Sequence, residues 1–91
     1  MRVLLLRPRF QLDDRTFTVL ALPWYDAAND EWAPQLIFVP IDRSLPRSVS
    51  TLLPRRSHRR DEVLASLKRV SDRVIVRALR ALELSESAPP A

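Results

Sequence analysis

Residues 16–41 read TFTVLALPWYDAANDEWAPQLIFVPI, two apolar runs separated by a short polar segment. The first run, 16–25, is rich in β-branched and aromatic residues, which favour strands. The second run, 35–41, has the length of a strand. Between them, DAAND at 26–30 supplies the Asp and Asn that loops prefer. This stretch predicts a β-hairpin at the centre of the fold.

Alternation along the first run separates its two faces, because successive side chains of a strand point to opposite sides. One face carries Phe17, Val19 and Ala21, and the other carries Thr16, Thr18, Leu20 and Leu22. A turn that pivots at Ala28 gives one of several possible registers. It would pair Trp24 with Trp32, Leu20 with Leu36 and Thr18 with Phe38, which are favourable cross-strand pairs.

Prolines interrupt the strand pattern. Pro23, Pro34 and Pro40 lie in or beside the two runs, and proline cannot donate a hydrogen bond to a ladder, so we expect them at edges, bulges or strand ends. Upstream, residues 2–7 form a short apolar run that Pro8 stops, which favours a further strand. The sequence therefore predicts a small and irregular sheet.

The apolar period changes in the C-terminal half. Residues 42–56 carry two prolines and no clear period, so we expect an extended connection. From residue 57, apolar residues recur every three or four positions, which predicts an amphipathic helix over 57–84. Its apolar stripe consists of Val63, Leu67, Val70, Val74, Ala78 and Ala81, widened by Leu64, Ile75 and Leu82.

The ends of this helix also have recognisable signals. Ser57 can serve as the N-cap, and Asp61 and Glu62 lie in the opening turns, where the helix dipole favours negative charge. A helix over 57–84 would be about 42 Å long, whereas a compact domain of this size is only about 32 Å across. We therefore expect the helix either to break or to protrude. Residues 85–91 should form a flexible tail.

Together these elements predict an α+β fold in one small domain over 1–84. We expect an antiparallel sheet of about three strands, over 2–7, 16–25 and 35–41, followed by one long C-terminal amphipathic helix. No run approaches the roughly 18 apolar residues of a membrane span. The N-terminal apolar run is also too short for a signal peptide. We expect the protein in the cytoplasm.

Composition excludes several classes of chemistry. The chain has no cysteine, which rules out disulfides, thiol nucleophiles and thiolate metal sites. It has no glycine, which excludes the P-loop, the dinucleotide-binding turn and the nucleophile elbow. Its one histidine, His58, lies among arginines, a place that suits surface binding better than general-base catalysis. We expect no metal and no cofactor.

Carboxylates are the remaining route to catalysis. Asp42 follows directly on an apolar run, whereas turn chemistry accounts for the others. The candidates for a magnesium site or an acid–base pair are Asp13 with Asp14, Asp26 with Asp30 and Glu31, and Asp42. We assign none of them a catalytic role. A small basic ribonuclease-type toxin is the third and least supported alternative for function.

Arginine dominates the charge of the chain. Fifteen basic residues against eleven acidic ones give a net charge of +4, which makes polyanions plausible partners. Arg73 and Arg77 have no acidic residue three or four positions away, so an anionic partner would relieve their mutual repulsion. The predicted phosphate-binding residues are Arg55, Arg56, Arg59 and Arg60 around the N-terminal end of the helix and Arg69, Arg73, Arg77 and Arg80 along one helical face.

Three aromatic residues cluster at the predicted hairpin tip. Trp24, Tyr25 and Trp32 either cap a small core or, if exposed, anchor a partner, since aromatic residues are enriched in binding sites. Both interpretations are compatible with the sequence.

The sequence predicts a small non-enzymatic binding module that contacts DNA or RNA phosphates through its arginines. The alternative is an adaptor, inhibitor or accessory subunit that binds a protein through its strand edge, its Trp hairpin or its amphipathic helix. A homodimer that pairs C-terminal helices is also expected. It would bury Val76, which lies away from the apolar stripe.

Overall fold

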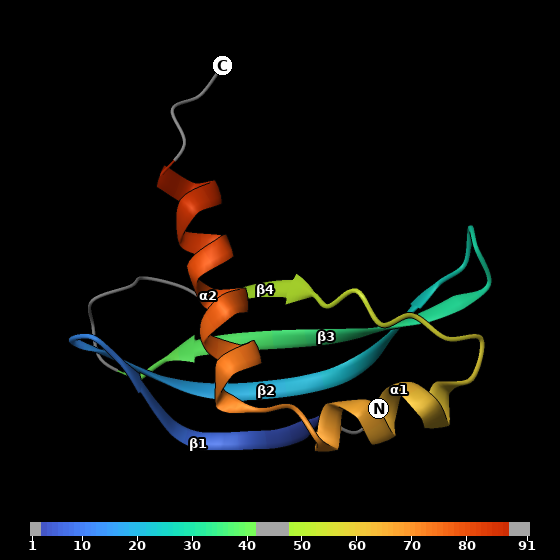
Figure 1. The fold of residues 1–91 in the computed structure, drawn as a ribbon, viewed down its shortest axis with the longest axis horizontal. Coiled ribbons are helices and arrows are strands. Elements are labelled where there is room, and N and C mark those ends of the chain that lie inside the picture. The colour runs from blue at the N-terminus through green and yellow to red at the C-terminus, as the bar shows by residue number, and fades with distance from the viewer. Residues whose placement is uncertain (1–2, 42–47, 88–91) are drawn as a thin grey trace.

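The computed structural model describes residues 3–41 and 48–87, with the backbone only for 84–87. Within these residues, a four-stranded antiparallel sheet carries two helices on one face (Figure 1). The strands pair in chain order and are β1 (Leu4–Leu12), β2 (Arg15–Asp26), β3 (Glu31–Pro40) and β4 (Val49–Leu52). The helices are α1 (Arg60–Lys68) and α2 (Asp72–Ser87). The predicted α+β class is confirmed, whereas the predicted three strands and single helix are corrected to four and two.

The hairpin of β2 and β3 forms, but its register differs by one residue from the predicted one. Tyr25, not Trp24, lies opposite Trp32, because the loop over 27–30 contains one residue more than a turn centred on Ala28 allows. Asp30 takes a left-handed conformation in this loop, with φ of 50°, which Asp tolerates better than most residues. The observed register places buried residues opposite buried residues. The predicted register would have paired core positions with positions on the other face.

Two prolines lie in the middle of the sheet, where we did not expect them. Pro23 and Pro34 are directly opposite each other in the β2–β3 ladder. Trp32 exchanges both backbone hydrogen bonds with Ser57, on the side away from β2, so its pair with Tyr25 is a non-hydrogen-bonded one. Non-hydrogen-bonded pairs recur at every second position of an antiparallel ladder. The pair of Pro23 and Pro34, two positions from Tyr25 and Trp32, is therefore also non-hydrogen-bonded. Neither proline therefore removes a bond from the ladder that joins β2 to β3.

The two edge strands also differ from expectation. β1 continues past Pro8 to Leu12, because a register shift between Arg7 and Phe10 accommodates this proline at the edge of the sheet. Thr18 of β2 donates a hydrogen bond to the Pro8 carbonyl (3.0 Å) across the irregularity. β4 lies inside the stretch 42–56 that we predicted to be an extended connection, and residues 42–47 of that stretch are outside the described residues.

The long predicted helix breaks over residues 69–71. Ser71 accepts a hydrogen bond at its Oγ from Val74 N (3.4 Å), and Asp72 opens the first turn of α2. Arg7 of β1 holds the break by donating to the Val70 carbonyl (3.2 Å) and to the Asp72 carboxylate (2.8 Å). Ser71 followed by Asp72 is an ordinary helix-start signal that the continuous apolar stripe concealed.

The start of α1 is also corrected. The N-cap position is Arg59, not Ser57, and its side chain makes no capping hydrogen bond. Ser57 instead forms an isolated bridge with Trp32, and its Oγ accepts a hydrogen bond from Arg59 N (3.1 Å) and donates one to Glu62 Oε2 (2.6 Å). Ser57 therefore ties the start of α1 to the β2–β3 hairpin.

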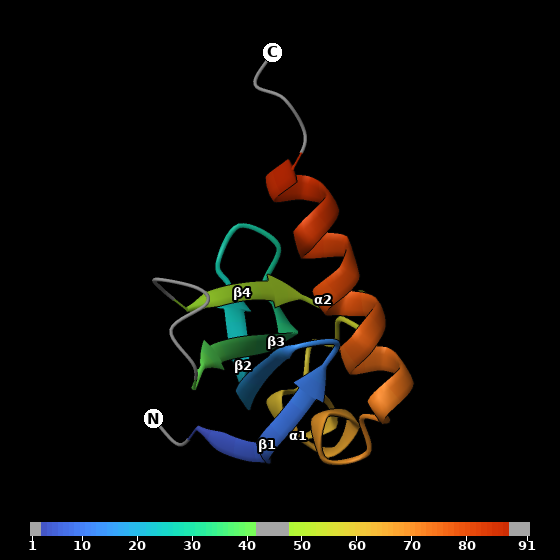
Figure 2. The same cartoon turned by 90° about the vertical axis from the view of Figure 1, so that its left-hand side faces the viewer.

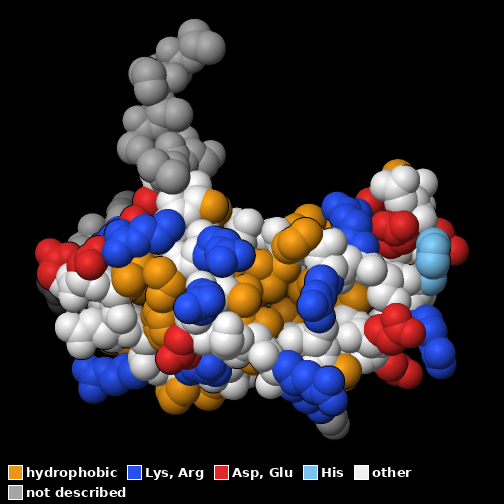
Figure 3. All heavy atoms as spheres, viewed as in Figure 1, with side chains coloured by type: hydrophobic (Ala, Val, Ile, Leu, Met, Phe, Trp, Pro, Cys, Tyr) orange, Lys and Arg blue, Asp and Glu red, His pale blue; other side chains and the backbone are white. Residues whose placement is uncertain are grey.

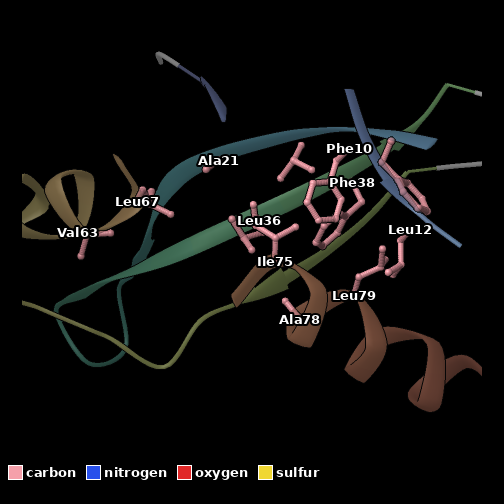
Figure 4. Packing of buried hydrophobic residues seen from close by; sticks show 12 residues of the cluster. Phe10, Leu12, Ala21, Leu36, Phe38, Val63, Leu67, Ile75, Ala78 and Leu79 are labelled. Atoms are coloured by element: carbon pink, nitrogen blue, oxygen red, sulfur yellow. The ribbon is translucent and has the colours of Figure 1, made fainter. Parts of the chain in front are cut away.

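The core lies between one face of the sheet and the two helices (Figure 4). Phe17 and Phe38 meet edge to face at its centre, with ring centroids 6.1 Å apart. Phe17, Val19 and Ala21 share one face of β2, as predicted, and the structure shows that this face is the buried one. The helices contribute Val63 and Leu67 from α1 and Ile75, Ala78 and Leu79 from α2.

The break also changes the phase of the C-terminal stripe. Leu79 is buried although the predicted stripe omits it, and Ala81 is exposed although the stripe includes it. Val76 packs against the core of its own chain, so it no longer argues for paired helices. Along the described residues, no helix is long and apolar enough to cross a membrane. The cytoplasmic placement stays a prediction.

The phase of α2 can be tested by two substitutions. Leu79→Ala should lower the free energy of unfolding by about 2–5 kcal/mol, because it leaves a cavity in a closed core. Ala81→Ser, on the exposed side, should change it by no more than about 0.5 kcal/mol. Chemical denaturation followed by circular dichroism measures both. Equal effects at the two positions would contradict the observed packing of α2.

Candidate functional site

A groove of about 540 Å³ opens on the helix-bearing face of the molecule, between the chain that follows β4 and the break between α1 and α2. Figure 3 shows apolar surface in this region with basic side chains around it. We call it the arginine groove. Its apolar lining includes Leu53, Pro54, Val70 and Val74, and its exposed cations are Arg55, Arg69 and Arg77.

The arginine groove exists because the helix breaks. Val70 lies in the break and Val74 in the first turn of α2, so both valines line the groove and remain only half-buried. The opposite wall comes from the extended segment after β4, where Leu53 N donates a hydrogen bond to the Pro34 carbonyl (2.7 Å). The apolar triplet Leu52, Leu53 and Pro54 is the sequence signal for this wall. These three residues fall within 42–56, for which the sequence predicts only an extended connection.

The cations of the arginine groove are available to a ligand. Among the described residues, Arg55, Arg69 and Arg77 make no ion pair, and all three are exposed. Arg73, one turn before Arg77 on α2, is also exposed and makes no ion pair with the described residues. With Arg59 and Arg60, these four make six of the eight predicted phosphate-binding arginines that form no ion pair within the described residues.

Three of the other four predicted arginines contact side chains of the same chain. Arg56 forms an ion pair with Asp26 (2.9 Å), and Arg80 forms one with Asp13 (3.2 Å). The guanidinium of Arg60 lies 5.8 Å from the ring centroid of Trp32, a cation–π contact. Arg59 is exposed at the start of α1. The eight arginines thus do not form one continuous ladder, because α1 and α2 are separate helices.

The aromatic residues at the hairpin do not form one cluster. Tyr25 and Trp32 lie on the core face of the hairpin with ring centroids 5.0 Å apart, and Trp32 packs against the core. Trp24 points to the other face of the sheet by alternation and is 41% exposed. Trp32 therefore covers the core, while Trp24 and Tyr25 are exposed. A partner-binding role for the exposed residues stays a prediction.

Hydrogen bonds at the hairpin tip shift two pKa values. Asn29 donates to Asp26 Oδ2 (2.8 Å) and, with a smaller contribution from Arg56, lowers the pKa of the Asp26 carboxyl. Tyr25 donates its hydroxyl proton to Asp30 Oδ1 (2.7 Å), which raises the pKa of the Tyr25 phenol. Both groups are at the surface. The hydrogen bonds that shift these pKa values stabilise the loop. They do not make Tyr25 and Asp26 an acid–base pair.

Among the described residues, the remaining candidates for chemistry lie at two places, the β2–β3 hairpin tip and the β1–β2 turn. His58 Nδ1 is 2.9 Å from the Asp30 carbonyl oxygen, at the exposed hairpin tip. Asp13 is paired with Arg80, and Asp42 is outside the described residues. In the ranges 3–41 and 48–87, no three His, Asp or Glu side chains are close enough to hold a metal ion. The arginine groove is the candidate site.

The chain matches no family model, and no curated protein or solved structure matches it. We therefore infer function from the residues of this chain alone.

The hydrogen bond at the hairpin tip predicts the titration of Tyr25. Because the phenol is stabilised in its protonated form by the Asp30 carboxylate, its pKa should lie above the ordinary value and fall toward it in Asp30→Asn. Asn tolerates the left-handed conformation at this position, so the loop should persist. The chain has one tyrosine, so the absorbance of ionised tyrosine reports on Tyr25 alone. Asp14→Asn, which removes a charge elsewhere, should leave the titration unchanged.

Proposed function

We propose that the protein is a non-enzymatic binding module whose arginine groove takes an acidic, extended segment of a protein partner. One observation carries the proposal: exposed arginines without ion pairs in the described chain flank a half-buried aliphatic surface. Charge-assisted hydrogen bonds to carboxylates are stronger than neutral ones. The aliphatic surface between the cations would gain free energy by covering apolar side chains of the same partner.

The aliphatic lining favours a polypeptide over a nucleic acid. Proteins that hold single strands combine cations with aromatic side chains, on which the bases stack. None of the described residues that line the arginine groove is aromatic. Leu53, Val70 and Val74 offer no flat surface for a base, but they suit the branched side chains of a peptide.

Among the described strands, β4 has one edge with no neighbour, and this edge favours an extended partner. Leu53 is bonded to Pro34 across the β3–β4 ladder, and bonded and non-bonded pairs alternate along such a ladder. Ser50 and Leu52 therefore belong to non-bonded pairs, and their N–H and C=O groups point away from β3. Leu52 also lines the arginine groove. A partner strand could add to this edge by main-chain hydrogen bonds while its acidic side chains reach the arginines.

DNA or RNA is the second candidate partner. Arg69, Arg73 and Arg77 are exposed and lack ion pairs among the described residues, and arginines of this kind suit phosphate contacts whose affinity falls steeply with salt. Contacts of that type would position the protein on a nucleic acid without reading its sequence.

Synthetic ligands can test the partner class. The probe is a labelled nine-residue peptide of alternating Glu and Val, compared with a Lys and Val peptide and with short single-stranded and duplex DNA and RNA, at two salt concentrations. We expect the acidic peptide to bind, and Arg69→Glu/Arg77→Glu to weaken its binding by more than about tenfold, equivalent to about 1.4 kcal/mol. Fluorescence anisotropy measures both.

A matched double variant separates local from overall charge. Arg9→Glu/Arg59→Glu changes the net charge by the same amount at two exposed positions outside the lining of the arginine groove, and it should bind the acidic peptide nearly as well as the unchanged protein. Equal losses of peptide affinity in the two double variants would show that net charge, and not the arginine groove, accounts for the binding. Tight, salt-sensitive binding of nucleic acid without binding of the acidic peptide would favour the second candidate.

A further inference from the structure

The sheet has a bare face. Both helices pack on the side that carries Phe17, Val19 and Phe38, and Figure 2 shows nothing over the other side among the described residues. By alternation, the bare side presents the even-numbered residues of β2 and their cross-strand partners. We call its apolar part the open face, and its residues are Leu5, Leu20, Leu22, Trp24, Ile37 and Val39.

Strand pairing gathers these residues into one patch. Leu5 lies opposite Leu20, which lies opposite Ile37, so three strands contribute to a single row. Leu22 and Val39 flank this row along β2 and β3. Neighbours in the sheet leave most of them half-buried, whereas Leu5 is 59% exposed. A contiguous apolar patch on a surface usually marks an interaction site.

The centre of the open face carries no charge. The polar positions among its apolar residues are Thr18, Gln35 and Ser50, which are all neutral. Its nearest acidic pair, Asp26 opposite Glu31, lies at the hairpin end, where Arg56 contacts both carboxylates at 2.9 and 4.0 Å. The unpaired arginines described above belong to the helix-bearing side.

We propose that the open face binds the same face of a second copy of this chain. Two copies with a net charge of +4 repel each other. Because the centre of the open face is uncharged, contact through it adds no repulsion there and leaves the arginines of both grooves on the outer sides. Face-to-face packing of two antiparallel sheets about 10 Å apart is a standard arrangement. The contact is self-complementary, as a two-fold interface requires.

The size of the open face suits a dimer. Strands of 9, 12, 10 and 4 residues, at about 3.3 Å along a strand and about 4.8 Å between strands, give the whole bare side of the sheet a flat area of roughly 550 Å² before side-chain relief is counted. A standard interface buries about 800 Å² per partner, which is of the same order.

This contact differs from the predicted pairing of C-terminal helices. The apolar side of α2 packs on its own sheet through Ile75, Ala78 and Leu79, so those residues are not free for a second helix. A dimer through the open face would leave both arginine grooves accessible, on opposite outer sides of the assembly. Two grooves would let one dimer hold two acidic segments.

Light scattering over a range of micromolar concentrations tests the dimer. We expect twice the chain mass of 10.5 kDa for the unchanged protein and the monomer mass for Leu20→Thr/Ile37→Thr. That double variant replaces a central cross-strand pair by residues that strands tolerate. Val70→Thr/Val74→Thr makes a comparable polar change in the arginine groove and should remain dimeric. A monomeric unchanged protein, or a dimer that survives Leu20→Thr/Ile37→Thr, would overturn the proposal.

A second measurement does not depend on the folding of these variants. Trp24 lies on the open face, whereas Trp32 packs on the core side, so Trp32→Phe leaves a single tryptophan that reports on the open face. Acrylamide quenching of Trp24 fluorescence should fall several-fold as concentration drives the monomer into the dimer. Quenching that stays constant while the mass doubles would show that the copies meet elsewhere, and would contradict the proposal.

Discussion

The register of β2 against β3 is the constraint on which the other features of the structure depend. It places Val19 opposite Phe38 and Ala21 opposite Leu36 on one side, which gives the two helices a single apolar surface to cover. The same register sends Leu20, Leu22, Ile37 and Val39 to the other side. It also allows Pro23 and Pro34 at the centre of the sheet, because their pair needs no hydrogen bond across the β2–β3 ladder. A slip by one residue would exchange the two faces of one strand.

The helix break follows from the surface that this sheet offers. A continuous helix over 57–84 would be about 42 Å long, whereas the principal extents of the molecule are 37, 35 and 23 Å. Two shorter helices let Leu67 and Ile75 both reach the core. Arg7 holds the break through the Val70 carbonyl and the Asp72 carboxylate. The break leaves Val70 and Val74 half-buried beside Leu53, and this exposed aliphatic surface is the one that the free arginines flank.

Charge is divided between the two broad sides of the molecule. The helix-bearing side presents Arg55, Arg69 and Arg77 around the arginine groove, whereas the centre of the open face is neutral. This division separates a surface suited to an acidic partner from a surface suited to a second copy. The arginines of the groove and the apolar row of Leu5, Leu20 and Ile37 therefore serve different contacts.

The sequence by itself determined the hairpin, the division of β2 into two faces and the amphipathic character of 57–84, because turn chemistry and apolar period act between near neighbours in the chain. It even contained the signals for the helix break, in Ser71 and Asp72, and for the groove wall, in Leu53 and Pro54. Only the tertiary structure decided which arginines are free. Arg80 is paired with Asp13, 67 residues away in the chain, and Arg56 with Asp26, 30 residues away. Ion pairs over such separations depend on how the elements pack, as does the choice of which sheet face the helices cover, and no local pattern encodes either.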